Sequence, residues 1–67
     1  MQLELDHGQL STIRMALIAW SARCEREAKV MDEFAKDETL DPDKCRRNAV
    51  ASREFRARAD ELLAALP

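Results

Sequence analysis

The chain has 67 residues, which is enough for one small domain. Charged residues make up 36% of it, but the net charge is only -2, and this balance favours neither nucleic acid nor an anionic membrane as a partner. Two cysteines are too few for a disulfide scaffold, and the N-terminus lacks the pattern of a secretory signal, so we expect a cytoplasmic protein. No apolar run approaches the roughly 20 residues that cross a bilayer, because Arg14 and Arg23 bracket the most hydrophobic segment.

The first element in chain order is a helix predicted from residue 7 to about residue 38. Residues 1–5 alternate polar and apolar too briefly for a strand, and we expect a frayed or docking tail there. Asp6 can accept hydrogen bonds from the amides of a starting helix, and Gln9 can reach back to it as in a capping box. No proline or glycine interrupts the helix after Gly8, although acidic residues near residue 38 oppose the helix dipole and weaken its last turn.

The apolar residues of this helix recur at alternating steps of three and four, which is the heptad spacing of a coiled coil. They are Leu10, Ile13, Leu17, Trp20, Cys24, Met31 and Phe34. Glu27 is the one polar residue in this seam, where we expect it beside Ser52 and within reach of Arg56. We interpret Glu27 as a polar layer that fixes the register, with a functional carboxylate as the alternative.

A turn over residues 39–41 separates the first helix from a second one predicted over 42–66. Asp41 fits the N-cap position and Pro42 the first helical position, while Asp43 adds a favourable charge to the first turn. Leu40 precedes the cap, where it can pack on Cys45 as a hydrophobic staple. A connection this short indicates antiparallel helices.

The second helix repeats the heptad period through Cys45, Ala49, Ser52, Phe55, Ala59, Leu62, Leu63 and Leu66. Pairing the seams outward from the turn puts Cys24 near Phe55 and Trp20 near Ala59, so that large side chains meet small ones. The sequence therefore predicts an all-α fold, an antiparallel two-helix hairpin forming a single domain. In this register the two cysteines are about 15 Å apart along the helices, beyond disulfide reach, and should be free thiols.

A second apolar stripe lies on the first helix, well over 90° around from the seam. It comprises Met15, Ile18, Ala19 and Ala22. A helix that is apolar on two sides is usually sandwiched between neighbours, and a core this small needs a supplement. We predict that the chain associates with itself through this stripe, most simply as a homodimer that forms a four-helix bundle. The alternatives are that Leu3 and Leu5 fold back over the stripe, or that another protein's helix docks there.

No residue pattern in the sequence indicates a reaction, a cofactor or a metal, and we expect neither an enzyme nor a small-molecule substrate. His7 is the only histidine, and neither Cys24 nor Cys45 is placed beside it to share a metal or to gain a catalytic base. Trp20 is interpreted as a core anchor.

The second helix is rich in arginine, which raises the alternative of a small DNA-associated regulator. The residues that would contact nucleic acid are Arg46, Arg47 and Arg53. The basic side chains spread around the helix, however, and nothing resembles the tight turn of a helix-turn-helix. We therefore favour a protein–protein interaction module whose partners are a second copy of itself and a further, unidentified protein.

The segments LSTIRMALIAW (residues 10–20) and REFRARADELLAAL (residues 53–66) resemble the short helical proteins, rich in Ala, Arg and Glu, that actinobacteria and their phages encode. The resemblance is one of style across both helices. It implies a small cytosolic accessory protein, of phage origin, and it carries over no functional residue.

Overall fold

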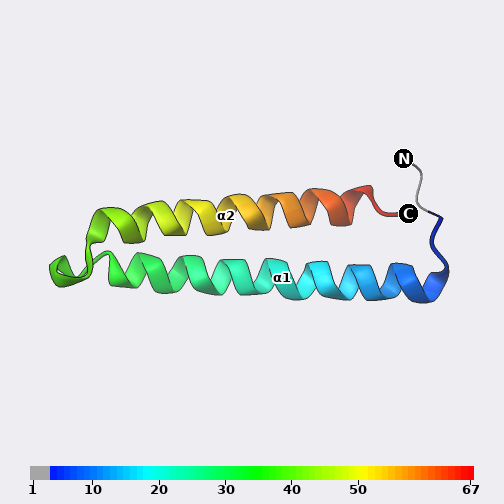
Figure 1. Ribbon diagram of the computed structural model, residues 1–67, viewed down its shortest axis with the longest axis horizontal. Helices are drawn as coiled ribbons and strands as arrows, with labels where there is room; N and C mark the ends of the chain where they lie inside the picture. The colour runs from blue at the N-terminus through cyan, green and yellow to red at the C-terminus, as the bar shows by residue number, and fades with distance from the viewer. Residues whose placement is uncertain (1–3) are drawn as a thin grey trace.

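The computed structural model describes residues 4–67 and shows two antiparallel helices that lie side by side (Figure 1). Helix α1 spans His7–Phe34, a short 3₁₀ helix η1 spans Glu38–Leu40, and helix α2 spans Pro42–Ala65. The predicted all-α helical hairpin is therefore confirmed, while its assembly into a four-helix bundle stays a prediction. The first three of the tail residues 1–5 lie outside the described residues.

Both helices begin where their capping residues predict. The Asp6 carboxylate accepts a hydrogen bond from the Gln9 amide at 2.7 Å, and the Gln9 side chain accepts one from the Asp6 amide at 3.0 Å, which completes the capping box. At the start of α2 the Asp41 carboxylate accepts from the Lys44 amide at 3.3 Å, and Pro42 occupies the first helical position. Asp41 itself adopts a left-handed backbone conformation, with φ 51°.

Helix α1 ends at Phe34, four residues before the predicted end at residue 38. The Asp37 carboxylate accepts hydrogen bonds from the amide of Thr39 at 2.9 Å and from its hydroxyl at 2.6 Å, and these bonds hold the η1 turn. An aspartate that bonds the backbone two residues on offers the chain an alternative to the helix, which explains the earlier stop. Helix α2 ends at Ala65, one residue before its predicted end.

Only small side chains are buried between the two helices. They are Cys24, Ala28, Cys45, Ala49 and Ala59. Both cysteines are free, as the register predicts, and the Cys45 thiol lies 3.2 Å from the Leu40 carbonyl oxygen. Ala28 is 0% exposed, although the seam read from the sequence passed through its neighbour Glu27. Small residues in this layer let the two helix backbones approach closely.

Four of the predicted core side chains are not buried in the hairpin and correct that part of the core prediction. Their exposed fractions are 42% for Trp20, 43% for Phe34, 48% for Phe55 and 56% for Leu62. The remaining large seam residues, Leu10, Ile13, Leu17, Met31 and Leu66, are half-buried. The heptad seam is wider than the strip that one neighbouring helix covers, so one flank of each helix stays open.

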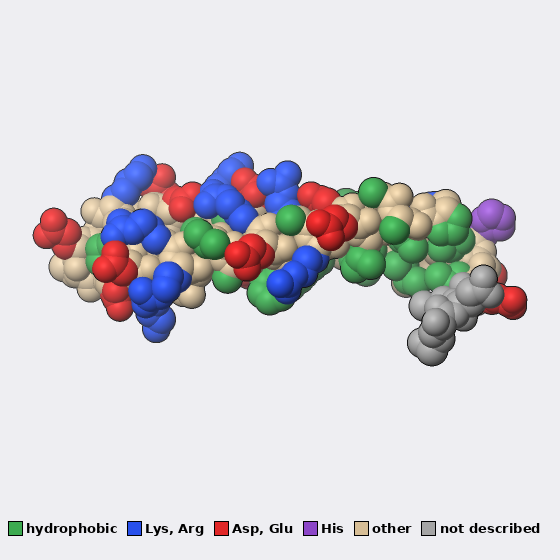
Figure 2. Space-filling model, turned by 90° about the horizontal axis from the view of Figure 1, so that it is seen from above, with side chains coloured by type: hydrophobic (Ala, Val, Ile, Leu, Met, Phe, Trp, Pro, Cys, Tyr) green, Lys and Arg blue, Asp and Glu red, His purple; other side chains and the backbone are tan. Residues whose placement is uncertain are grey.

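The hairpin is a single layer of helices and is far from spherical. Its extents are 50 × 20 × 13 Å, and its radius of gyration is 15.5 Å, against about 11 Å for a compact domain of the same length. Figure 2 shows hydrophobic side chains gathered over the half that carries His7 and charged ones over the half near the turn. Within residues 4–67 no helix is both long and apolar enough to cross a membrane.

Candidate interaction surfaces

The hairpin has two broad faces, and polar side chains bridge the helices on one of them, which we call the polar face. Its bridges join Ser21 to Asp60 at 2.8 Å, Arg56 to Glu25 at 2.7 Å, and Arg53 to Asp32 at 2.6 Å. Ile18, Ala22 and Leu63 line a hollow beside these bridges. The face is thus made of polar pairs with a few apolar atoms between them.

In the Asp32–Arg53 bridge, the pKa values of both partners are shifted. The hydrogen bond from Arg53 lowers the pKa of the Asp32 carboxyl below its ordinary value, and the same bond raises the pKa of Arg53. Both side chains are 45% exposed, so water screens the pair and its effect on stability is modest. The pair orders the two helices relative to each other and offers no reactive group.

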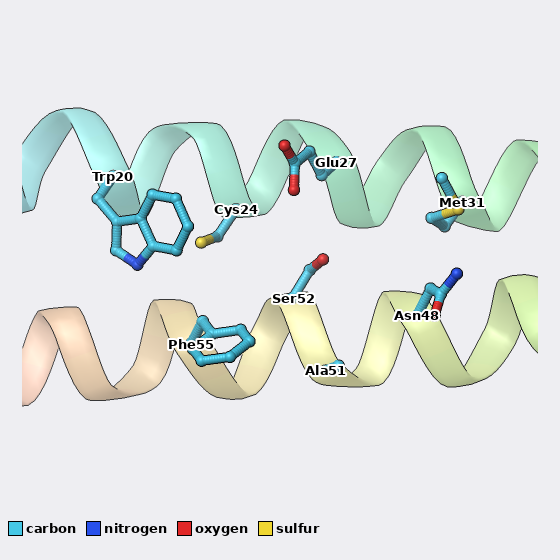
Figure 3. Close-up of a pocket in the computed structure, with 8 residues that line it drawn as sticks. All are labelled: Trp20, Cys24, Glu27, Met31, Asn48, Ala51, Ser52 and Phe55. Carbon is cyan, nitrogen blue, oxygen red and sulfur yellow. The ribbon is translucent and has the colours of Figure 1, made fainter.

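The opposite broad face carries the exposed aromatic residues, and we call it the aromatic face. Its centre is a groove of about 440 Å³ (Figure 3) lined by Trp20, Cys24, Glu27, Met31, Asn48, Ala51, Ser52 and Phe55. The rings of Trp20 and Phe55 meet edge to face across the two helices, with centroids 6.3 Å apart and an interplanar angle of 67°. Phe34 lies two heptads beyond Trp20, and Leu62 one heptad beyond Phe55, so the heptad period places both on this same side.

Two arginines lie at the rim of the aromatic face. The guanidinium of Arg23 lies 5.9 Å from the Trp20 ring centroid, and that of Arg58 lies 5.5 Å from the Phe55 ring centroid. Within residues 4–67, no hydrogen bond or ion pair joins the two helices on this face. On this face the two helices are therefore joined by aromatic and apolar contacts, and the Arg23–Glu27 ion pair stays within α1.

Glu27 lies in the groove of the aromatic face, and its predicted partners are corrected by the structure. Its carboxylate is exposed and pairs with Arg23, one turn earlier on the same helix, at 3.0 Å. Arg56 instead pairs with Glu25 on the polar face. Ser52 lines the same groove as Glu27, as the register predicts, but Glu27 forms no bridge between the helices in this part of the chain.

The predicted association surface on α1 is open to solvent, and we call it the α1 stripe. Met15, Ile18, Ala19 and Ala22 are all exposed, Met15 by 71% and Ile18 by 58%. Leu5 does not cover them, because it lines a separate hollow with Thr12 and Ile13. Leu3, the other residue predicted as a cover, lies outside the described residues.

The arginines proposed for nucleic-acid contact do not form one free basic patch. Arg46 pairs with Asp43 and Arg53 with Asp32, so two of the three already have acidic partners. Arg47 is exposed, one residue and hence about 100° around α2 from Arg46. This arrangement neutralises the basic charge locally and does not favour a phosphate backbone as the partner.

No reactive arrangement emerges among the described residues. Within residues 4–67, no three His, Cys, Asp or Glu side chains converge in a way that could hold a metal ion. His7 lies exposed at the start of α1, whereas Cys24 and Cys45 are buried between the helices. Comparisons with protein-family models, with curated proteins and with solved structures found no match to this chain.

The aromatic face as a continuous surface is the feature that the sequence analysis missed. Its residues were assigned to the core because the heptad period includes them. A signal was present at Ala28: the steps Cys24 to Ala28 to Met31 also alternate four and three, and this path leaves Glu27 outside the seam. Choosing Ala28 would have turned the buried strip away from Trp20 and Phe34.

Proposed function

We propose that the protein is a non-enzymatic helical hairpin that associates with itself and serves as a protein–protein interaction module. In this proposal a second copy packs on the α1 stripe, and the homodimer forms a four-helix bundle. The observation that carries the proposal is the surface left uncovered by a single layer of two helices. Folded domains normally bury their apolar faces between at least two layers.

The chain exposes more surface to solvent than a compact monomer of the same mass does. The chain exposes 5383 Å², whereas a compact monomer of 7.7 kDa exposes about 4,300 Å². The difference of roughly 1,000 Å² exceeds the about 800 Å² that each partner buries in a standard protein–protein interface. Burying such an area would restore the ratio of surface to mass that is typical of stable small proteins.

The composition of that surface supports the same function. Met15 and Ile18 are large apolar side chains exposed by more than half, next to the small residues Ala19 and Ala22. Small residues beside large ones allow close packing between helices, and contiguous exposed apolar surface marks interaction sites. We place the protein in the cytoplasm because both of its thiols are free. A phage-encoded accessory role, which the resemblance in sequence implies, stays a prediction.

The test is the solution mass, measured by light scattering during size exclusion at low and high salt. We expect a multiple of 7.7 kDa for the wild type and a lower mass for Ile18→Glu and Met15→Glu, because a buried carboxylate opposes association. Val50→Glu is the matched control, since Val50 is 56% exposed on α2, away from the stripe. A wild type that stays at 7.7 kDa at high micromolar concentration would contradict the proposal.

A further inference from the structure

We infer that the aromatic face is a second self-association surface, on which another copy of the chain lies across a two-fold axis near the Trp20–Phe55 pair. The inference rests on the proposed function, because it also requires that the hairpin associate with itself. It concerns a different face, so each surface can be tested without the other. The occupant is a second copy of this chain, as the next observations argue.

The first observation is the mismatch between the heptad seam and the buried strip. In a four-helix bundle, each apolar seam points at the bundle centre, between the neighbour in its own layer and the neighbour in the other layer. Here α1 and α2 cover each other's small residues, while Trp20, Phe34, Phe55 and Leu62 stay exposed. All four lie on the aromatic face. The seam is thus aimed at a centre that lies outside the single hairpin, on this side of it.

The second observation is the position of the aromatic pair along the hairpin. Trp20 is the fourteenth of the 28 residues of α1, and Phe55 is the fourteenth of the 24 residues of α2. An axis near the middle of the molecule would bring this pair onto the same pair of the second copy. Such an isologous contact is the common form of homodimer interface. With that axis perpendicular to the helices, Leu62 of one copy would lie over the half of the other copy that contains Phe34.

The third observation concerns size and charge. The broad face measures 50 × 20 Å, roughly 1,000 Å² in projection, which suffices for a standard interface of about 800 Å² per partner. A face that meets its own copy must not carry charges of one sign only, because like charges would then oppose each other. This face presents both signs, with Arg23 and Arg58 at the rim and Glu27 in the groove.

The mass of single-face variants tests the inference. With both surfaces occupied, dimers formed through the α1 stripe pair into a tetramer, so we expect Phe55→Glu to halve the mass of the wild-type assembly and Ile18→Glu to halve it independently, and the double variant to be a monomer of 7.7 kDa. Val50→Glu, an apolar-to-acidic change on the outer side of α2, should leave the mass unchanged. Far-UV circular dichroism of each variant shows whether the helices persist. An unchanged mass for a helical Phe55→Glu would overturn the inference.

Tryptophan fluorescence tests the same face without relying on the folding of a variant. Trp20 is the only tryptophan and is 42% exposed in the hairpin, so a second copy on the aromatic face would bury it further. We expect the wild-type emission to shift to longer wavelength on dilution as the assembly dissociates. The shift should persist in Ile18→Glu, where the aromatic face remains intact. Emission that does not change with dilution, from a wild type whose mass falls to the 7.7 kDa of the monomer, would overturn the inference.

The two proposals fail in distinguishable ways. If Ile18→Glu leaves the mass unchanged while Phe55→Glu halves it, the aromatic face is upheld and the α1 stripe is wrong. If only Ile18→Glu lowers the mass and Trp20 stays exposed, the α1 stripe is upheld and the aromatic face is left open for another protein or for stacked bases. A monomeric wild type with exposed Trp20 would overturn both.

Discussion

Replacing Ala28 with leucine tests whether the two helices are closely packed at the middle of the hairpin. Ala28 is 0% exposed and lines neither the aromatic groove nor the hollow on the polar face, so we expect a larger side chain there to press against the facing helix. Three extra carbon atoms would stabilise by about 0.8 kcal/mol each if they were buried without strain. In a filled site they instead force the helices apart, at a net cost of about 1–3 kcal/mol.

The expected result for Ala28→Leu is a fall in the free energy of unfolding, measured by urea titration at fixed protein concentration. At about 4–8 °C per kcal/mol for a domain of this size, the melting temperature should fall by roughly 5–20 °C. Ala57→Leu is the matched control, because Ala57 is exposed on α2 and leucine has nearly the helix propensity of alanine. If Ala28→Leu were as stable as Ala57→Leu, the close packing at this layer would be refuted.

Three further changes probe the local interactions. Asp6→Ala removes the capping box and should lower the free energy of unfolding by about 0.5–2 kcal/mol in a urea titration. Because the pKa of Asp32 is lowered in the folded state, its ion pair stabilises the protein fully above the ordinary carboxyl pKa of 3.8, and this stabilisation is lost as the pH falls through the lowered pKa. Thermal melts from pH 7 to pH 2 should show this loss of stability. The loss should be smaller in Asp32→Asn, which lacks the carboxylate. Asp41→Ala removes the cap but keeps the left-handed backbone and should cost about 1 kcal/mol, whereas Asp41→Gly relieves the strain and should cost only a few tenths by the same measurement.

The sequence was sufficient for the topology and for both helix starts, because these depend on local chemistry. Asp6 with Gln9, and Asp41 with Pro42, satisfy backbone amides that any helix start leaves without partners, whatever the rest of the chain does. The end of α1 was placed too late because Asp37 competes with the helix through its own side chain. That competition is also local, and the spacing from Asp37 to Thr39 is the signal that could have indicated it.

The division of the seam into a buried and an exposed flank depends on whether Glu27 or Ala28 belongs to the seam, and the alternation of three and four residues allows both. Periodicity fixes the sector of a helix that is apolar, but both flanks of that sector look alike until the side on which the other helix lies is known. Trp20 and Phe55 therefore looked like core residues, although alanines and cysteines fill the space between the helices. The α1 stripe could be recognised as a second apolar stripe because it lies far from the seam, where this ambiguity does not arise, and its role as an association surface stays a prediction.

The arrangement of the chain ends has a mechanical consequence. The start of α1 and the end of α2 lie at the same end of the hairpin (Figure 1). A force that separates them therefore acts across the helices and breaks the contacts between α1 and α2 one after another. The bridge from Ser21 to Asp60 would break before the Asp32–Arg53 pair, which lies nearer the turn. Such a force would open the hairpin from its apolar end, and the turn would be the last part to separate.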